Sequence, residues 1–377
     1  YRELYPMSFD EPLFNIHLNV DFPFNLTGVL YFPKIKPNVE PQRNKIQLFQ
    51  KQVFVTDSVE GIVPDFLTLL HGVIDSPDIP LNVSRSYLQA DGNVKKISSH
   101  ITKKVADKLD EMFRKDREDF EAKWNDMKII IEYGMLTEDK FFDKAKKFAM
   151  YEDTDGKLHT FDAYLESIKE NQTDKDKKTV VLYASHKDGQ HSYIQAAKAK
   201  GYQVLLLDSP LTSHLIQKLE SEHKDTTFAR VDSDLIDNLI KKDETRVAKL
   251  SDKQKEELKT RLETIVPKEK FTLKLEDMES TEAPLVITVP EFMRRMKEMQ
   301  MTGGGGMMGM GDFPEMYDLV VNANHSLASK ILDTDDEGAR AAAVNQALDL
   351  AKLQQNLLHG EELTAFIARS YEMLENE

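Results

Sequence analysis

Apolar and polar residues alternate along the first part of the chain. Apolar side chains occupy every second position from Phe14 to Val20, and Asn or His stands between them. This period of two is typical of a strand with one buried face. Similar stretches at 28–32 and 46–55 extend the pattern, so we expect a mostly antiparallel sheet. A short helix over 64–70 follows, because proline in a first helical turn loses no hydrogen bond.

The spacing of apolar residues changes to three and four between about 92 and 131. This spacing is typical of an amphipathic helix, and charged residues fill the positions between the apolar ones. Similar spacing predicts helices around 141–148 and 161–168. The apolar residues that define the long helical segment are Ile97, Ile101, Val105, Leu109, Phe113, Phe120 and Trp124.

A compact strand–helix–strand unit is predicted over residues 179–208. Two apolar runs, 179–183 and 204–207, flank a helical stretch that Gly201 is suited to end. Near-continuous apolar runs are typical of parallel strands that are covered on both faces.

A charge-rich segment with few large apolar residues, 241–257, predicts the main domain boundary. A helix, two strand candidates and two closing helices, about 338–358 and 361–375, follow this segment. The predicted fold class is α+β / α/β, with two α-β-α layered modules joined by a helical segment and then a smaller α+β domain. The expected domains are 1–125 with the large module, 126–240 with the connector and the small module, and 241–377.

Composition narrows the possible functions. Lys and Arg number 50 and Asp and Glu number 65, a net charge of −15, which opposes nucleic-acid binding. The chain has no cysteine, and its ten histidines lack metal-ligand spacing, so we expect no metal site. No apolar run approaches the roughly 18 residues of a membrane helix. No signal peptide opens the chain, and we expect a cytoplasmic protein without membrane partners.

The most distinctive stretch, residues 53–89, reads VFVTDSVEGIVPDFLTLLHGVIDSPDIPLNVSRSYLQ. It closely resembles the middle domain of the ninety-kilodalton heat-shock chaperone family. The KAKGYQVLLLDSP run at 198–210 resembles the second half of that domain, and the carboxy-terminal third is a looser match. The resemblance implies an ATP-dependent chaperone whose amino-terminal ATPase domain lies outside this chain. The last residues, which lack the MEEVD and KDEL endings of the eukaryotic members, resemble the bacterial type.

The resemblance also implies a role for Arg85. In the family, an arginine at this place contacts the γ-phosphate of ATP that the separate amino-terminal domain holds. Gln89 matches a glutamine that joins these contacts, and Asn82 is a weaker match; Val83 replaces the family's leucine. A guanidinium can donate two hydrogen bonds to phosphate oxygens and offset developing charge. ATP and Mg²⁺ are thus expected in the full-length protein, and neither is expected to bind this chain alone. Without the resemblance, a plain ion pair with a surface carboxylate is the favoured interpretation of Arg85, because a short motif alone is weak evidence for a function.

A second segment is rich in methionine. Eight of the 15 methionines lie between 293 and 316, and flexible, polarisable methionine is common on adaptable binding surfaces. In the family, a helix at this place binds unfolded or partly folded client proteins, and apolar middle-domain surface does so as well. The alternative is an ordinary core helix, with Trp124 as a packing residue. The residues expected to contact clients are Phe292, Met293, Met296, Met299 and Trp124.

The two closing helices each carry an apolar stripe, and two helices alone cannot bury both. The family pairs this element with its copy in a second subunit as a four-helix bundle, which implies a homodimer. Packing against another part of the same chain is the alternative. The residues expected at the dimer interface are Val344, Leu348, Ala351, Leu363, Phe366 and Ile367.

Two other functions are open on the residues alone. A free-standing α/β enzyme would need a pocket near 184–190 or 208–212 and activity without a partner domain. A non-catalytic dimeric scaffold would bind proteins without reporting nucleotide state. Enzymatic activity of the isolated chain is not expected, whereas the full-length protein is expected to be an ATPase.

Overall fold

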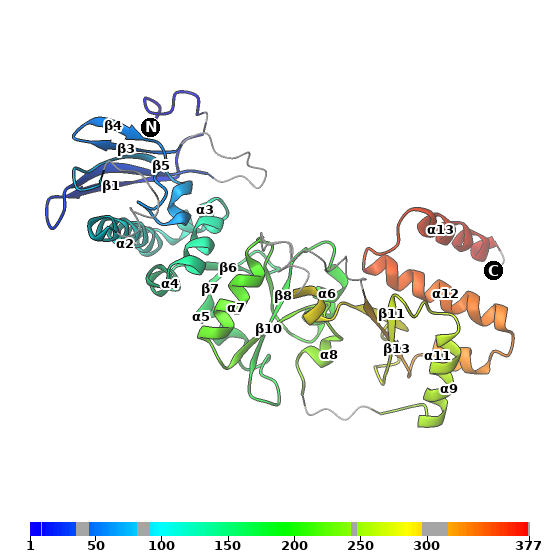
Figure 1. Cartoon of the computed structure of the whole chain (residues 1–377). Helices are drawn as coiled ribbons and strands as arrows, with labels where there is room; N and C mark the ends of the chain where they lie inside the picture. The colour runs from blue at the N-terminus through cyan, green and yellow to red at the C-terminus, as the bar shows by residue number, and fades with distance from the viewer. Residues whose placement is uncertain (9, 35–44, 81–90, 243–246, 296–315, 376–377) are drawn as a thin grey trace. The chain divides into compact units, whose positions relative to one another are not determined.

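The computed structural model describes residues 1–8, 10–34, 45–80, 91–242, 247–295 and 316–375 (Figure 1). Its mixture of helices and several sheets confirms the predicted fold class. The contacts divide the chain into two compact units rather than three. The predicted boundaries at 125 and 240 stay predictions. The first unit holds 1–152, 156–164 and 214–219, and the second holds 153–155, 165–213 and 220–377.

The first unit contains the expected sheet. Its strand order is β1-β2-β5-β3-β4, and every neighbouring pair is antiparallel except β3 and β5. The alternation in the sequence is observed on β1, where Ile16 and Leu18 are buried and Asn15, His17 and Asn19 are exposed. The strands are β1 (Phe14–Val20), β2 (Leu26–Phe32), β3 (Ile46–Gln50), β4 (Val53–Thr56) and β5 (His71–Asp75).

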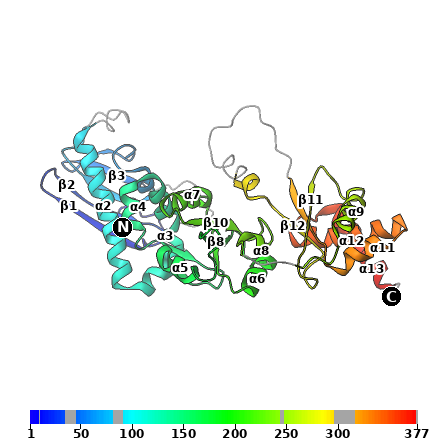
Figure 2. The same cartoon turned by 90° about the horizontal axis from the view of Figure 1, so that it is seen from below.

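The predicted long helical segment consists of two helices, α2 (Gly92–Lys115) and α3 (Arg117–Thr137). Asp116 leaves the helical conformation at φ −147°, and its carboxylate accepts a hydrogen bond from the Asp119 amide at 3.0 Å. This bond caps the start of α3. The α2 helix lies along one face of the sheet in both views (Figures 1 and 2). Shorter elements are η1 (Asp65–Leu69), α4 (Asp139–Ala145), β6 (Met150–Glu152), β7 (Leu158–Thr160) and α5 (Phe161–Ile168).

Trp124 lies in the core of the first unit. Its side chain is only 2% exposed, and its ring packs 6.2 Å from that of Phe120 on the preceding turn of α3. A side chain that is enclosed in this way cannot contact a client. The assignment of Trp124 to the client-binding set is therefore wrong for this conformation, and the packing alternative describes it.

The second unit begins with the predicted strand–helix–strand unit. The strands are parallel in the order β10-β8-β9, and Gly201 follows the helix with a positive φ of 76°. This left-handed conformation is the one that glycine adopts at a helix end. The elements are β8 (Thr179–Ala184), α6 (His191–Ala199), β9 (Val204–Leu206), β10 (Thr226–Arg230) and α8 (Ile236–Leu239). Helix α7 (Thr212–Glu222) is divided, since its residues 214–219 belong to the first unit.

A second sheet of this unit has the order β11-β13-β12, with β11 parallel and β12 antiparallel to β13. Helix α9 begins inside the charge-rich segment, where Ser251 and Gln254 form a capping box. The elements are α9 (Asp252–Glu263), β11 (Phe271–Glu276), β12 (Leu285–Thr288), β13 (Tyr317–Asn322), α11 (Ser326–Asp333), α12 (Glu337–Gln354) and α13 (Gly360–Glu375). No helix in the described ranges is both long and apolar enough to cross a membrane.

Helix α12 packs on the sheet of its own chain. Val344, Leu348 and Ala351, which were expected at a dimer interface, are buried with Leu319 and Ile287 of the sheet. The expectation is wrong for these three residues, because they pack against the sheet of their own chain and not against a second subunit.

Candidate functional site

The predicted phosphate-contacting residues Arg85, Gln89 and Asn82 lie outside the described residues. The chain on both sides of 81–90 is held by hydrogen bonds. Before it, the Gln50 side chain donates to the carbonyls of Pro77 and Ile79 at 3.3 and 3.2 Å. After it, the Asp91 carboxylate accepts from the amides of residues 93 and 94 at 2.8 and 3.1 Å and so caps α2. The segment that carries Arg85 thus joins the end of β5 to the start of α2.

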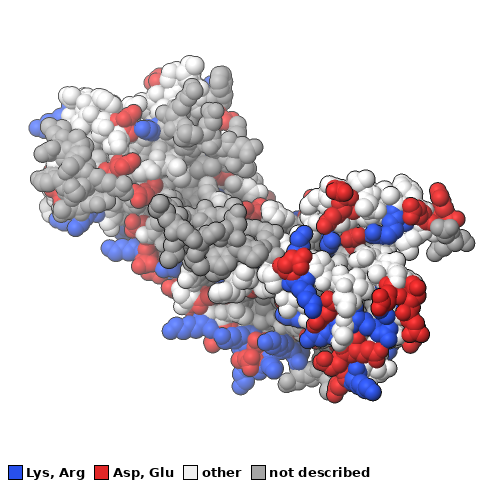
Figure 3. Space-filling view, turned by 45° about the vertical axis from the view of Figure 1, so that its right-hand side comes forward, with Lys and Arg blue, Asp and Glu red and all other residues white. Residues whose placement is uncertain are grey.

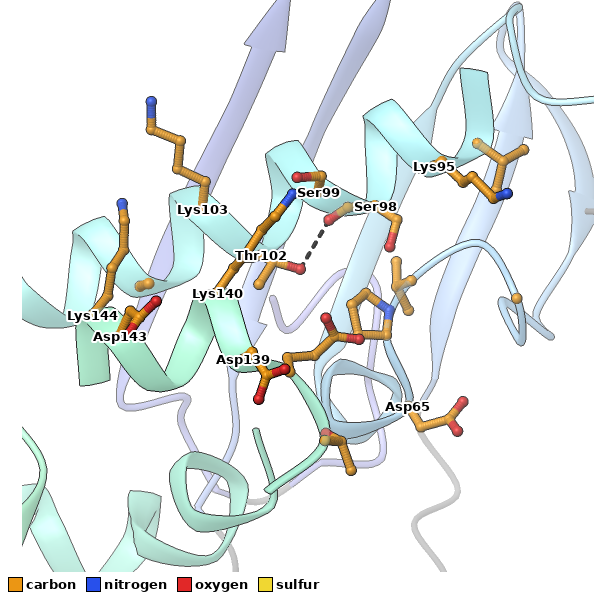
Figure 4. A pocket seen from close by; sticks show the side chains of 17 residues that line it. Asp65, Lys95, Ser98, Ser99, Thr102, Lys103, Asp139, Lys140, Asp143 and Lys144 are labelled. Atoms are coloured by element: carbon orange, nitrogen blue, oxygen red, sulfur yellow. Dashed lines mark hydrogen bonds between the residues drawn. The ribbon is translucent and has the colours of Figure 1, made fainter. Parts of the chain in front are cut away.

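A groove of about 850 Å³ lies beside the first half of α2. Buried side chains such as Val63 and Val94 lie along it, with the hydroxyl groups of three α2 residues nearby. The Thr102 hydroxyl donates to the Ser98 carbonyl at 2.9 Å, the dashed line in Figure 4. Charged residues from η1, α2 and α4 lie around the groove: Asp65, Lys95, Lys103, Glu138, Asp139, Lys140, Asp143 and Lys144.

These charges carry both signs, and several are already paired. Lys144 bonds Asp107, and Lys218 bonds Asp139 at 2.8 Å, which lowers the pKa of Asp139. Burial and then the neighbouring Asp139 raise the pKa of Glu138. The described residues include no cluster of three or more His, Asp or Glu that could hold a metal ion.

A buried histidine lies under the first residues of the chain. The ring of His71 stacks on Tyr1, and its Nδ1 lies 2.9 Å from the Tyr1 hydroxyl. The Tyr5 hydroxyl donates to the Lys45 carbonyl at 2.8 Å and accepts from the Gly72 amide at 2.7 Å. Burial lowers the pKa of His71 to about 4 and raises the pKa of Tyr5 to about 12. Both groups are therefore neutral near pH 7 and act in packing.

The methionine-rich segment is described at its start, through residue 295, and again from Met316. Residues 291–295 are helical, Phe292 is 73% exposed and Met293 is half-buried. Met296 and Met299 lie outside the described residues. The charged Arg294, in contrast, is only 6% exposed. This short helical segment thus presents an aromatic side chain to solvent and turns charged side chains inward, the reverse of an ordinary surface helix.

An ion network holds the inward side chains of this helical segment. The Glu291 carboxylate accepts hydrogen bonds from Arg294 at 2.5 Å and Arg295 at 2.7 Å, and Arg294 also donates to the Tyr183 hydroxyl on β8. Arg295 reaches both carboxylate oxygens of Glu220, at 3.1 and 3.3 Å, and the Phe228 carbonyl at 3.1 Å. We name Glu291, Arg294, Arg295, Tyr183 and Glu220 the arginine latch.

The latch charges stabilise one another. Burial alone would raise the pKa of Glu291, but the two guanidinium groups outweigh it and hold that pKa below its ordinary value. Burial would lower the pKa of Arg295, and the hydrogen bonds of Glu220 and Glu291 raise it instead. Burial, followed by the charge of Glu291, raises the pKa of Tyr183, which therefore stays a neutral phenol. Sequence reasoning missed this network, because Glu and Arg at helical spacing are typical of a solvated surface.

The closing helices expose an apolar stripe of a different composition from the one expected. Of the predicted residues, Ile367 is 44% exposed, whereas Phe366 is buried and Leu363 half-buried. Arg369 of α13 donates to Gln346 at 2.8 Å and to Asp349 at 2.6 Å, which fixes α13 against α12. We name the exposed set the terminal stripe: Leu350 and Leu353 of α12, and Ile367, Tyr371 and Leu374 of α13.

The charged surface is mixed in sign. Figure 3 shows Lys and Arg side chains interspersed with Asp and Glu over the face that it draws. Such an arrangement differs from the continuous positive stripe that binds nucleic acid. It agrees with the net charge of −15.

Comparisons with known proteins identify the family. The family model described as Hsp90 protein matches residues 1–376, so the chain belongs to the Hsp90 family. It is of the HtpG type. The Chaperone protein HtpG of Porphyromonas gingivalis strain ATCC 33277 is 53% identical over 357 residues, which cover 94% of this chain and 52% of the relative.

More distant and longer alignments agree. The Chaperone protein htpG of Bacteroides fragilis strain 638R is 47% identical over 441 residues, covering 99% of this chain and 64% of the relative. That of Myxococcus xanthus is 26% identical over 386 residues, covering 96% of this chain and 56% of the relative. The chain thus spans between about half and two thirds of the length of these relatives.

Proposed function

We propose that this chain is the middle and carboxy-terminal region of an ATP-dependent molecular chaperone that assists protein folding and remodelling. The observation that carries the proposal is the identity of 47–53% to proteins named Chaperone protein HtpG over nearly the whole chain. The stretch at 53–89 that resembles the family's middle domain lies in β4, η1, β5 and the segment before α2. Cytoplasmic location belongs to the same proposal.

In this function, Arg85 completes an ATP site on a separate amino-terminal domain, which holds ATP and Mg²⁺. A guanidinium that reaches the γ-phosphate would offset charge that builds up on the transferred phosphoryl group, with Gln89 and Asn82 beside it. Placing the arginine on another domain makes hydrolysis wait for domain closure. Support comes from the fixed chain on either side of the segment, which begins after β5 and ends at the cap of α2.

The test is Arg85→Ala in this chain joined to that amino-terminal domain. ATP turnover should fall on the order of 100-fold, while nucleotide affinity stays within about two-fold, because the arginine acts mainly on the transition state. Arg85→Lys keeps the charge but loses the paired donors, so it should give an intermediate rate. Unchanged turnover in Arg85→Ala would refute the role and would favour the non-catalytic scaffold.

Client binding is proposed for Phe292, Met293, Met296 and Met299. The exposure of Phe292 supports it, since a large aromatic side chain in solvent is a candidate contact for an unfolded chain. Phe292→Ser should weaken binding of a permanently unfolded protein about ten-fold, a loss typical of one aromatic contact. The matched control is Phe22→Ser, which removes a phenylalanine of the first unit that is 88% exposed. Equal losses in both variants would contradict the assignment.

Homodimerisation is proposed through the terminal stripe. The family implies dimers in general, and the stripe supplies apolar side chains on both closing helices that its own chain leaves exposed. Two copies of α12 and α13 can bury these side chains against each other as a four-helix bundle.

A further inference from the structure

The hydrophobic effect alone does not explain how the helical segment 291–295 is oriented. Burial of Phe292 and Met293 against the neighbouring sheet would be favourable, yet Phe292 is exposed and Arg294 takes the inner position. Taking two arginines and their carboxylate partners out of water is costly, and apolar residues of similar size often stabilise a fold equally well. Charged groups add directional hydrogen bonds, because the N–H donors of the planar guanidinium point in fixed directions.

The latch supplies such directional bonds on two sides of the helical segment. Arg294 stacks with its guanidinium 5.4 Å from the Tyr183 ring and donates to the hydroxyl of the same residue. Arg295 bonds Glu220 at the carboxyl end of α7 and the Phe228 carbonyl on β10. Glu291 joins the two arginines at the spacing of one helical turn, with the acid before the bases, the favourable order.

The chain leading into the segment is fixed as well. The Val289 amide donates to the Asp232 carbonyl at 2.9 Å, and the Asp232 carboxylate accepts two bonds from Arg230 at 2.6 and 3.1 Å. The start of the helical segment is therefore fixed in position. The segment can still rotate about its own axis, and the latch prevents this rotation.

We propose that the arginine latch is a positioning device, which fixes the rotation of the helical segment 291–295 so that Phe292 faces outward for a protein partner. The role assigned to Phe292 rests on the client-binding proposal above, whereas the rotation itself does not. Without the latch, the helical segment turns its aromatic side inward, and the apolar surface is lost while the fold remains.

The chain has no cysteine, so Phe292→Cys introduces a single thiol whose reaction rate with a maleimide reports exposure. Cysteine itself behaves as a small apolar side chain and is free to turn inward. With the latch intact, the thiol should react nearly as fast as a free thiol. Adding Arg294→Met should slow the reaction at least about five-fold. Adding Arg295→Lys should slow it less, because lysine keeps the positive charge but loses the paired N–H donors of the guanidinium.

Client binding gives the second readout, with Phe292 left in place. Arg294→Met and Glu220→Gln should each weaken the affinity for fluorescently labelled, reduced and carboxymethylated lactalbumin about ten-fold. The control is Lys274→Met, which removes the 2.6 Å ion pair with Asp318 in the same unit and should change neither readout. If Arg294→Met fails to fold, both the labelling rate and the client affinity are measured in Glu220→Gln, which removes only a charge.

The outcomes separate the two proposals. A folded latch variant whose thiol reacts as fast as in the parent overturns the latch, whatever happens to client binding. If the parent chain binds no unfolded protein, client binding fails, and the labelling series still decides whether the latch sets the rotation. Slower labelling together with weaker binding supports both.

Discussion

Replacing Leu350 and Ile367 by glutamate should separate a dimer into folded monomers. These side chains are 52% and 44% exposed in the single chain, so about half of each remains to be buried. Full burial of such a side chain stabilises by about 1.5–3 kcal/mol, so half of one contributes about 1 kcal/mol. Two side chains in each of two subunits give about 4 kcal/mol, or a dissociation constant about a thousand-fold higher. Burying the new carboxylates would weaken the dimer further.

The assay is sedimentation velocity over a range of protein concentrations. The matched control is Asn345→Glu with Ala365→Glu, which adds the same charge at exposed positions of the same helices and should leave the dimer intact. A second comparison is Leu348→Ala, which should cost about 2–5 kcal/mol of folding stability, because Leu348 is buried on the sheet of its own chain. If the Leu350 and Ile367 variant keeps the parent dissociation constant, the terminal stripe is not the interface.

Two further predictions concern the first unit. Because burial lowers the pKa of His71 to about 4, its contribution to stability is fully present above the unfolded value near 6.5 and is lost as the pH falls towards 4. Chemical unfolding should show a loss on the order of 2 kcal/mol over that range, and His71→Phe should remove this part of the slope; an unchanged slope would contradict the assignment. Gly28→Ala should destabilise by about 3 kcal/mol, since the added carbon would lie 2.3 Å from the Val73 carbonyl oxygen. Gly92→Ala, which meets no atom within 4 Å, should be nearly neutral, and equal losses in thermal unfolding would refute the steric argument.

The periodic spacing of apolar residues predicted correctly those elements that bury one face and expose the other. The alternation at 14–20 became β1, because one side of that strand packs under α2 and the other remains open. The break at Asp116 was missed, because the apolar spacing continues through it. Phe113 before the break and Phe120 after it pack with ring centroids 5.5 Å apart, so the period shows no interruption.

The surfaces that carry the proposals were harder to predict. Helix α12 has apolar residues on two sides, and the sequence cannot tell that Leu348 faces the sheet while Leu350 faces solvent. Only the position of β11, β12 and β13 decides this. The latch depends on partners 75 or more residues earlier in the chain, so no local pattern could have distinguished Arg294 from a surface arginine.

The most direct test of the central claim adds this chain to the separately purified amino-terminal domain of a relative, such as the HtpG of Porphyromonas gingivalis, and measures ATP turnover. Turnover should rise with the concentration of the chain and saturate, whereas the Arg85→Ala chain should give no rise at the same concentrations. Equal stimulation by both chains, or none by either, would contradict the claim that this polypeptide completes a phosphate site held elsewhere.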